Sequence, residues 1–139
     1  MDTHTLLLAL LALFGWGVGS FVAKIAANRL GNIVVFWDLV GYAAVTIVYA
    51  LLVFKPAAIA INDPVGVGLA LFSGAIGATA GIAFFLLLVQ KEASVVVPLT
   101  AVYPALTAIL AFLFLKESLT CLKALGIVFA TLAVYLLSL

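Results

Sequence analysis

The chain has 139 residues, of which 68% are hydrophobic and 8% are charged, with a formal net charge of +1. A soluble domain is about 45–50% apolar and about 25% charged, and a fold of this size cannot hide the excess from water. This composition excludes a soluble enzyme and a disordered tail, and the small net charge leaves no basic patch for nucleic acid. We therefore expect an integral membrane protein that is surrounded by the lipid bilayer.

The cysteine and histidine content excludes further kinds of site. Cys121 is the single cysteine and His4 the single histidine, so neither an intrachain disulfide nor a thiolate or imidazole metal cage can form. No nucleophile, base and orienting group fall together, so we expect no enzyme and no cofactor. Residues 1–5 carry no Lys or Arg before the apolar run, so we expect no cleaved signal peptide.

Five apolar stretches are predicted to cross the bilayer, since a core about 30 Å thick needs about 20 apolar residues. Backbone groups in lipid must be paired internally, so each stretch is expected to be a helix. Short loops make neighbouring helices antiparallel. The predicted spans are 5–27, 33–54, 64–89, 95–115 and 121–139, and they form a single membrane domain over residues 1–139.

Local signals set the predicted ends of these helices. Gly31 is suited to end the first helix, and Asn32 to cap the second. Residues 55–56 stop the second helix, and the longest loop follows over 56–63. The pair Asp63–Pro64 then starts the third helix, because a capping side chain precedes Pro at the first helical position.

Basic residues are divided equally between the two sides of the predicted bundle. Lys24, Arg29 and Lys91 lie near the first and third loops, and Lys55, Lys116 and Lys123 lie near the second and fourth. Cytoplasmic loops normally carry the excess of Lys and Arg, so this rule gives no preferred orientation here. Either another feature sets one orientation, or both orientations insert and two copies form an antiparallel homodimer, which places a transporter site at the midplane.

Two ionisable residues lie inside the first two predicted spans at similar depth. Lys24 is near the end of the first helix, and Asp38 is about 9 Å into the second. A charge in lipid costs a few kcal/mol or more and usually faces protein or water. Either Lys24 and Asp38 pair with each other, or Lys24 snorkels to the interface and Asp38 is an interfacial partner of Arg29 or Asn32.

Polar and aromatic side chains recur at helical spacing on the same two helices. The stripes are Trp16, Ser20 and Lys24 on the first helix, and Asp38, Tyr42, Thr46 and Tyr49 on the second. They line a substrate pathway, or they are packing faces between helices. Small residues four apart, which let helices approach closely, are interpreted as helix packing: Gly15 and Gly19, then Ser73, Gly77 and Gly81.

The fourth predicted helix contains a proline near its middle. Pro104 removes one backbone hydrogen bond, frees the carbonyl of Thr100 and is expected to kink the helix. The side chains of Thr100, Tyr103 and Thr107 lie on one face there. Either these side chains and the freed carbonyl are polar contacts for a ligand near the midplane, or the kink serves only to fit the helices together.

The C-terminal part of the chain resembles a known transporter signature. The run VQKEASVVVP at 89–98, then Pro104, then LKESLT at 115–120 is similar to EamA-type transporters of the drug/metabolite transporter superfamily. That pattern has a small residue and Ser before an apolar run, a mid-helix Pro, and a Gly-Glu-like step before a final helix. Lys116 stands where Gly is common.

The opening run 15–17 (Gly-Trp-Gly) followed by Lys24 is similar to the short five-helix bacterial and archaeal members of that family. The resemblance implies half of a ten-helix inverted-repeat fold, which must dimerise to enclose a pathway for a metabolite or drug. Related small multidrug resistance proteins use a Glu in the first helix. None stands here, so Asp38 is the carboxylate inside a predicted span that is left for a coupled proton.

These observations predict an all-α integral membrane protein with five transmembrane helices in the bacterial inner or archaeal plasma membrane. We expect a secondary transporter of a small organic solute that works as an antiparallel homodimer by alternating access. The alternatives are a non-transporting membrane subunit that completes another complex, and a multidrug exporter of the small multidrug resistance type. The predicted pathway residues are Trp16, Ser20, Lys24, Asp38, Tyr42, Thr100, Tyr103, Pro104 and Thr107.

Overall fold

The computed structural model describes residues 2–54 and 63–137, and every regular element in those ranges is a helix. Three of its helical segments are long and apolar enough to cross a membrane: Thr3–Val53, Pro64–Gln90 and Ala93–Leu115. A shorter apolar helix, Cys121–Leu137, follows them. The chain is therefore an all-helical protein of the membrane. The count of five crossings stays a prediction, because the first segment holds two helices in succession and the last helix is short.

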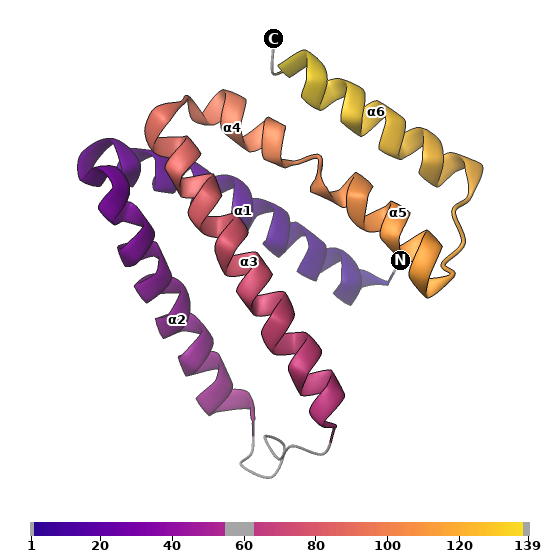
Figure 1. Ribbon diagram of the computed structural model, residues 1–139, viewed down its shortest axis with the longest axis horizontal. Helices are drawn as coiled ribbons and strands as arrows, with labels where there is room; N and C mark the ends of the chain where they lie inside the picture. The colour runs from indigo at the N-terminus through magenta and orange to yellow at the C-terminus, as the bar shows by residue number, and fades with distance from the viewer. Residues whose placement is uncertain (1, 55–62, 138–139) are drawn as a thin grey trace. The chain divides into compact units, whose positions relative to one another are not determined.

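The chain divides into two compact units, Met1–Gln90 and Lys91–Leu139. Figure 1 shows the helices of each. The first unit holds α1 (Thr3–Leu30), the short helix η1 (Gly31–Ile33), α2 (Val34–Val53) and α3 (Pro64–Gln90). The second unit holds α4 (Ala93–Thr100), α5 (Tyr103–Leu115) and α6 (Cys121–Leu137). That residues 1–139 form a single membrane domain stays a prediction.

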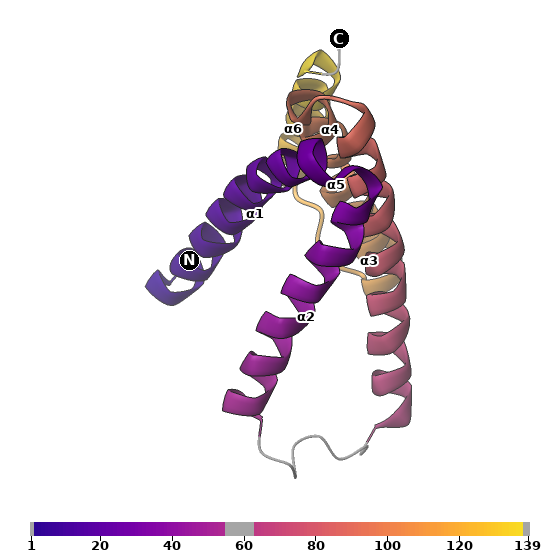
Figure 2. The same ribbon diagram turned by 90° about the vertical axis from the view of Figure 1, so that its left-hand side faces the viewer.

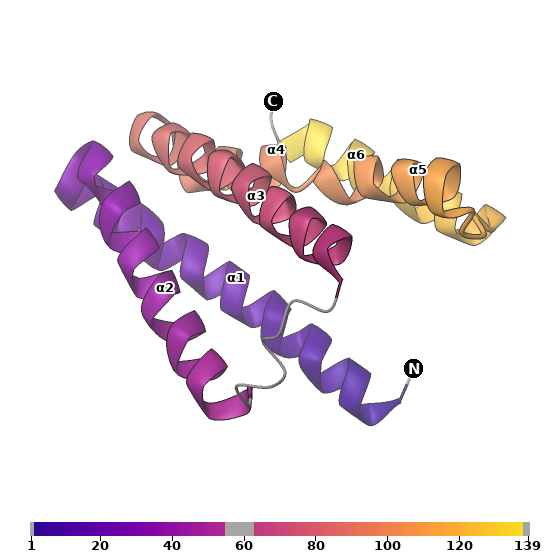
Figure 3. The same cartoon turned by 60° about the horizontal axis from the view of Figure 1, so that its bottom comes forward.

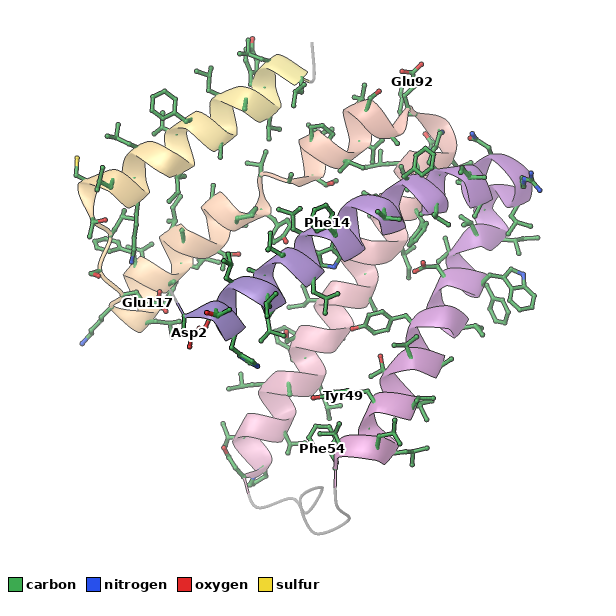
Figure 4. The ribbon with its side chains drawn as sticks, turned by 180° about the vertical axis from the view of Figure 1, so that it is seen from behind. Asp2, Phe14, Tyr49, Phe54, Glu92 and Glu117 are labelled. Carbon is green, nitrogen blue, oxygen red and sulfur yellow. The ribbon has the colours of Figure 1, made fainter. Side chains whose placement is uncertain are left out.

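The helix α1 has a capping residue at each end, Asp2 at its start and Gly31 at its end. The Asp2 carboxylate, labelled in Figure 4, accepts a hydrogen bond from the Thr5 backbone N–H at 2.8 Å. Hydrogen bonds from the Thr5 side chain and then its backbone hold the pKa of Asp2 below its usual value, so the cap is charged at neutral pH. At the other end Gly31 has a φ of 58°, a conformation that favours glycine, and its predicted role in ending the helix is confirmed.

The predicted cap of the second helix is wrong. Asn32 lies inside η1, and the residue before α2 is Ile33, which makes no side-chain cap hydrogen bond. A capping side chain needs extended backbone at its own position. Ile33 instead has φ −68° and ψ −16°, so the turn continues directly into α2. Residues 55–56, which were predicted to stop this helix, and the rest of the predicted loop up to residue 62 lie outside the described residues.

The helix α3 begins where the sequence predicts. The Asp63 carboxylate accepts hydrogen bonds from the backbone N–H groups of Val65 and Gly66, at 3.1 and 3.0 Å. Pro64 occupies the first helical position, where its missing N–H costs nothing. This arrangement confirms the predicted start signal of α3.

The N-terminal unit has a small core at one end of its three helices. The helices α1, α2 and α3 all contact one another, and they converge where α1 turns into α2 and where α3 ends (Figures 2 and 3). Ala27, Val34 and Leu88 are buried there, and Leu88 has no exposed surface. Toward the other end of the unit the helices diverge. The unit is therefore held together mainly at the α1–α2 turn.

The predicted fourth helix is interrupted where the sequence predicts a kink, and the interruption is a full break between two helices. The helix α4 ends at Thr100 and α5 begins at Tyr103, with a turn at residues 101–102. Pro104 has no N–H to donate to the Thr100 carbonyl, so the helical ladder cannot continue through this point. The Ala101 N–H is instead shared between the carbonyls of Val97 and Pro98, at 3.1 and 3.0 Å, which tightens the last turn of α4.

The helix α6 runs back along the broken helix and completes the C-terminal unit. It contacts both α4 and α5 (Figures 1 and 3). The connecting loop starts at Lys116, whose φ of 56° and ψ of 30° lie in the left-handed region. Glycine reaches this conformation without strain and lysine does not. The geometry gives a physical reason for the glycine that EamA-type sequences commonly carry at this position.

Candidate functional site

Lys24 joins two helices of the N-terminal unit near their converging ends. Its ammonium group donates a hydrogen bond of 2.7 Å to the backbone carbonyl of Leu88, and the contact is partly buried. Leu88 lies in the last turn of α3, where carbonyls lack partners within the helix. The negative end of the helix dipole also lies there, so a cation is favoured. Lys24 therefore caps α3 from α1.

The predicted ion pair between Lys24 and Asp38 stays a prediction. The Lys24 ammonium contacts the Leu88 carbonyl of α3, and Asp38 is an exposed residue of α2. The sequence does not reveal the Leu88 contact, because any residue carries a backbone carbonyl. A lysine within the last two turns of α1 is the signal that the sequence offers for it.

The other predicted pathway residues of the N-terminal unit lie on open helix surfaces. Trp16 and Tyr42 are 70% and 72% exposed, and Ser20 is half-buried. The carbonyl of Tyr42 accepts a hydrogen bond from the Thr46 hydroxyl at 2.8 Å, which ties that hydroxyl proton to its own helix. The two stripes thus remain accessible, and their role in a pathway stays a prediction.

The small residues that were interpreted as packing positions have space around them. A methyl group added at Gly15, Gly19, Gly77 or Gly81 would meet no atom within 4 Å in the described part of the chain, apart from its own helix backbone and chain neighbours. Ser73 is exposed. In the described part of the chain these glycines make no close contact with another helix. Their predicted role in helix packing stays a prediction.

On the polar face beside the helix break, the threonine hydroxyls donate their protons to nearby backbone carbonyls. The Thr100 hydroxyl contacts the carbonyls of Val96 and Val97 at 2.9 and 3.1 Å, and the Thr107 hydroxyl donates to the backbone carbonyl of Tyr103 at 3.1 Å. Each hydroxyl oxygen keeps lone pairs that can accept a hydrogen bond. Tyr103 is 58% exposed. Together with the Thr100 carbonyl, which Pro104 cannot pair, this face is best suited to bind a ligand that donates hydrogen bonds.

A family model for EamA-like transporters matches residues 3–139, which includes both units and the helix break. The chain belongs to the EamA-like transporter family. The resemblance seen in the sequence is thereby confirmed, and it extends from the C-terminal signature to nearly the whole chain. Proteins of this family are membrane transporters, and the long apolar helices of the chain are those of a multi-pass membrane protein.

One EamA-like relative shares the same short length. An uncharacterized protein of Methanocaldococcus jannaschii is 35% identical over 138 residues, which cover 99% of this chain and 98% of the relative. No solved structure matches the chain. The length shared with the archaeal relative fits a short member of the EamA-like family.

Proposed function

We propose that this EamA-like protein is a secondary transporter of a small organic solute, working as an antiparallel homodimer by alternating access with five crossings per copy. The observation that carries the proposal is the family match over residues 3–139. The bacterial inner or archaeal plasma membrane is the proposed location. The proposal of a dimer rests on three further features.

The first feature is the small core. In the described part of the chain the buried hydrophobic residues are Ala27, Val34, Leu88, Val96 and Val134. A pathway for a solute needs walls that exclude lipid, yet the polar stripe residues Trp16 and Tyr42 are mostly exposed. A second copy supplies the missing walls.

The second feature is the open face at the glycine positions. Small residues at intervals of four normally mark close helix contact in membranes, but Gly15, Gly19, Gly77 and Gly81 have open space in the single chain. The third feature is the equal division of basic residues between the two sides, which favours insertion in both orientations. Two oppositely inserted copies reproduce an inverted repeat.

The proposed binding site lies at the break between α4 and α5. Interrupted membrane helices expose backbone carbonyls that bind solutes and ions near the midplane of transporters. The proposed contacts are the Thr100 carbonyl and the oxygens of Thr100, Tyr103 and Thr107. We propose that Trp16, Ser20, Lys24, Asp38 and Tyr42 also belong to the substrate pathway, with Asp38 as the candidate carrier of a coupled proton.

A direct test measures uptake into proteoliposomes. The purified chain is reconstituted and offered a panel of radiolabelled amino acids, organic acids and nucleosides, with a cationic dye added, under an imposed pH gradient. The proposal expects concentrative uptake of at least one non-dye solute, reduced in the Tyr103→Ala variant. Uptake of the dye alone favours the multidrug exporter. Absence of uptake together with co-purification of a different chain favours the non-transporting subunit.

A further inference from the structure

The C-terminal unit contains a groove whose lining includes Pro104 and the turn at residues 101–102, but none of the proposed polar contacts Thr100, Tyr103 and Thr107. It has a volume of about 370 Å³ and lies between the start of α5 and one face of α6. Alanines at 101, 105 and 108 line one wall, and Gly126, Ile127 and Ala130 line the other. Small side chains on both walls leave the space open, and its surface is almost entirely apolar.

One cation stands at the loop end of the groove. Lys123 is among the lining residues, and its ammonium group donates a hydrogen bond of 3.1 Å to the carbonyl of Ser118. That acceptor is neutral, and an ammonium group has three protons to donate, so Lys123 can also bind an anionic group. The contact holds the lysine head beside the 116–120 loop, where Figure 4 labels Glu117.

The depth of Lys123 matches the level of lipid headgroups. The helix α6 has 17 residues and is about 25 Å long, a little shorter than a bilayer core of about 30 Å. Lys123 is the third residue of this helix, close to the interface. The groove continues from there along α6 to Thr131, about 12 Å farther into the apolar region.

The groove and the polar face at the helix break are different surfaces of α5. Pro104 and Ala108 are four residues apart and line the groove. Tyr103 and Thr107 are also four apart, but they are displaced by one residue, about 100° around the helix. A ligand in the groove therefore need not compete with the proposed solute.

We propose that this groove is a binding site for a phospholipid with an anionic headgroup, whose phosphate contacts Lys123 and whose acyl chain lies along α5 and α6. Surrounding lipid tails are as apolar as the groove, so the apolar contact alone gives no preference among lipids. Headgroup charge then decides selectivity. A basic residue near the surface favours an anionic lipid on the order of fivefold over a zwitterionic one.

The test compares two lipids with identical acyl chains. The full chain in mild detergent is mixed with equal amounts of palmitoyl-oleoyl phosphatidylglycerol and phosphatidylcholine, and the retained lipids are counted by native mass spectrometry. The parent is expected to retain phosphatidylglycerol about fivefold in excess. Lys123→Gln should remove most of this preference. Lys116→Gln is the matched control, because Lys116 lies in the same loop region and does not line the groove.

A second pair of variants tests the groove itself. A phosphatidylglycerol with a photoreactive group on its acyl chain should crosslink to residues 101–108 and 119–131. Ala108→Leu fills the space and should reduce this labelling several-fold, whereas Ala133→Leu, on α6 but outside the groove, should leave it unchanged.

Two outcomes would overturn the proposal. One is an equal lipid preference in Lys123→Gln and the parent, with Lys123→Met as a second variant without the charge if the Gln variant does not fold. The other is that Ala108→Leu changes the ratio of monomer to dimer and not the lipid labelling, which would assign the groove to a second copy.

Discussion

At the scale of single residues, the contact between Lys24 and Leu88 is central, because this one hydrogen bond of 2.7 Å joins α1 to the end of α3. Lys24→Met removes it. We expect the free energy of unfolding in detergent to fall by about 1 kcal/mol, the scale of interhelical hydrogen bonds in membranes. Arg29→Met is the control, since exposed Arg29 lies on the same helix and carries the same charge.

Combining Lys24→Met with Asp38→Asn distinguishes the contact of Lys24 with α3 from the predicted ion pair of Lys24 with Asp38. If Lys24 acts through Leu88 alone, the losses in Lys24→Met and Asp38→Asn should add within about 0.5 kcal/mol. A double variant that recovers part of the loss would show that the two side chains also interact. In that case Asp38 becomes the first residue to test for proton coupling, by the pH dependence of uptake.

Lys116 is a strained residue at the end of α5. Its left-handed conformation costs a side chain about 1–2 kcal/mol that glycine does not lose. Lys116→Gly should therefore raise the unfolding free energy by about 0.5–1 kcal/mol, after the greater freedom of glycine in the unfolded state is subtracted. Lys116→Ala should give no gain. A gain of equal size in both variants would mean that the charge, and not the backbone, is responsible.

At the scale of elements, the break between α4 and α5 is the feature most closely tied to function. Pro104→Ala restores an N–H that can pair with the Thr100 carbonyl and extend α4 into α5. We expect transport of the solute found in the uptake panel to fall about tenfold, a change of ~1.4 kcal/mol in the barrier. The protein should still insert and fold.

Pro98→Ala provides the matched control for this experiment, because Pro98 lies in α4 and not at the break. It should transport close to the parent rate. If Pro104→Ala inserts normally and transports as well as the parent, the break serves only to fit helices together.

The helix ends show how far the sequence specifies these elements. Gly31, Asp63 and Pro64 act locally, and the structure uses each as its residue type predicts. Asn32 fails because the cap depends on the backbone that η1 adopts, which one residue type does not determine. The sequence predicts a kink at Pro104 and not a full break at residues 101–102, because the shared hydrogen bonds of the Ala101 N–H depend on the backbone of that turn.

The candidate site was less predictable than the helices. Spacing placed Thr100, Tyr103 and Thr107 on one face, but it could not show that the two threonine hydroxyls bond to their own helices. The Lys24 contact to a backbone carbonyl and the groove beside Lys123 depend on how helices pack. In a chain this apolar, hydrophobic periodicity carries little information about which faces meet.

At the scale of the whole molecule, the balance of basic residues should control orientation. Adding two lysines to the N-terminus breaks the equal division and should shift most copies to one orientation. A reporter active only in the cytoplasm, fused after Leu139, measures the shift. Two added glutamines should leave the reporter signal at the parent level.

Transport by an antiparallel dimer requires that both orientations exist together. Glu92 and Glu117 are exposed and flank the segment Ala93–Leu115, so they lie on opposite sides of the membrane if that segment crosses it. With Cys121 changed to Ser, cysteines are placed singly at Glu92 or Glu117 and labelled in intact cells by a maleimide that cannot cross the membrane. Both sites should label to about half of the level reached after permeabilisation, because oppositely inserted copies expose opposite loops. Full labelling at one site and none at the other would contradict the account.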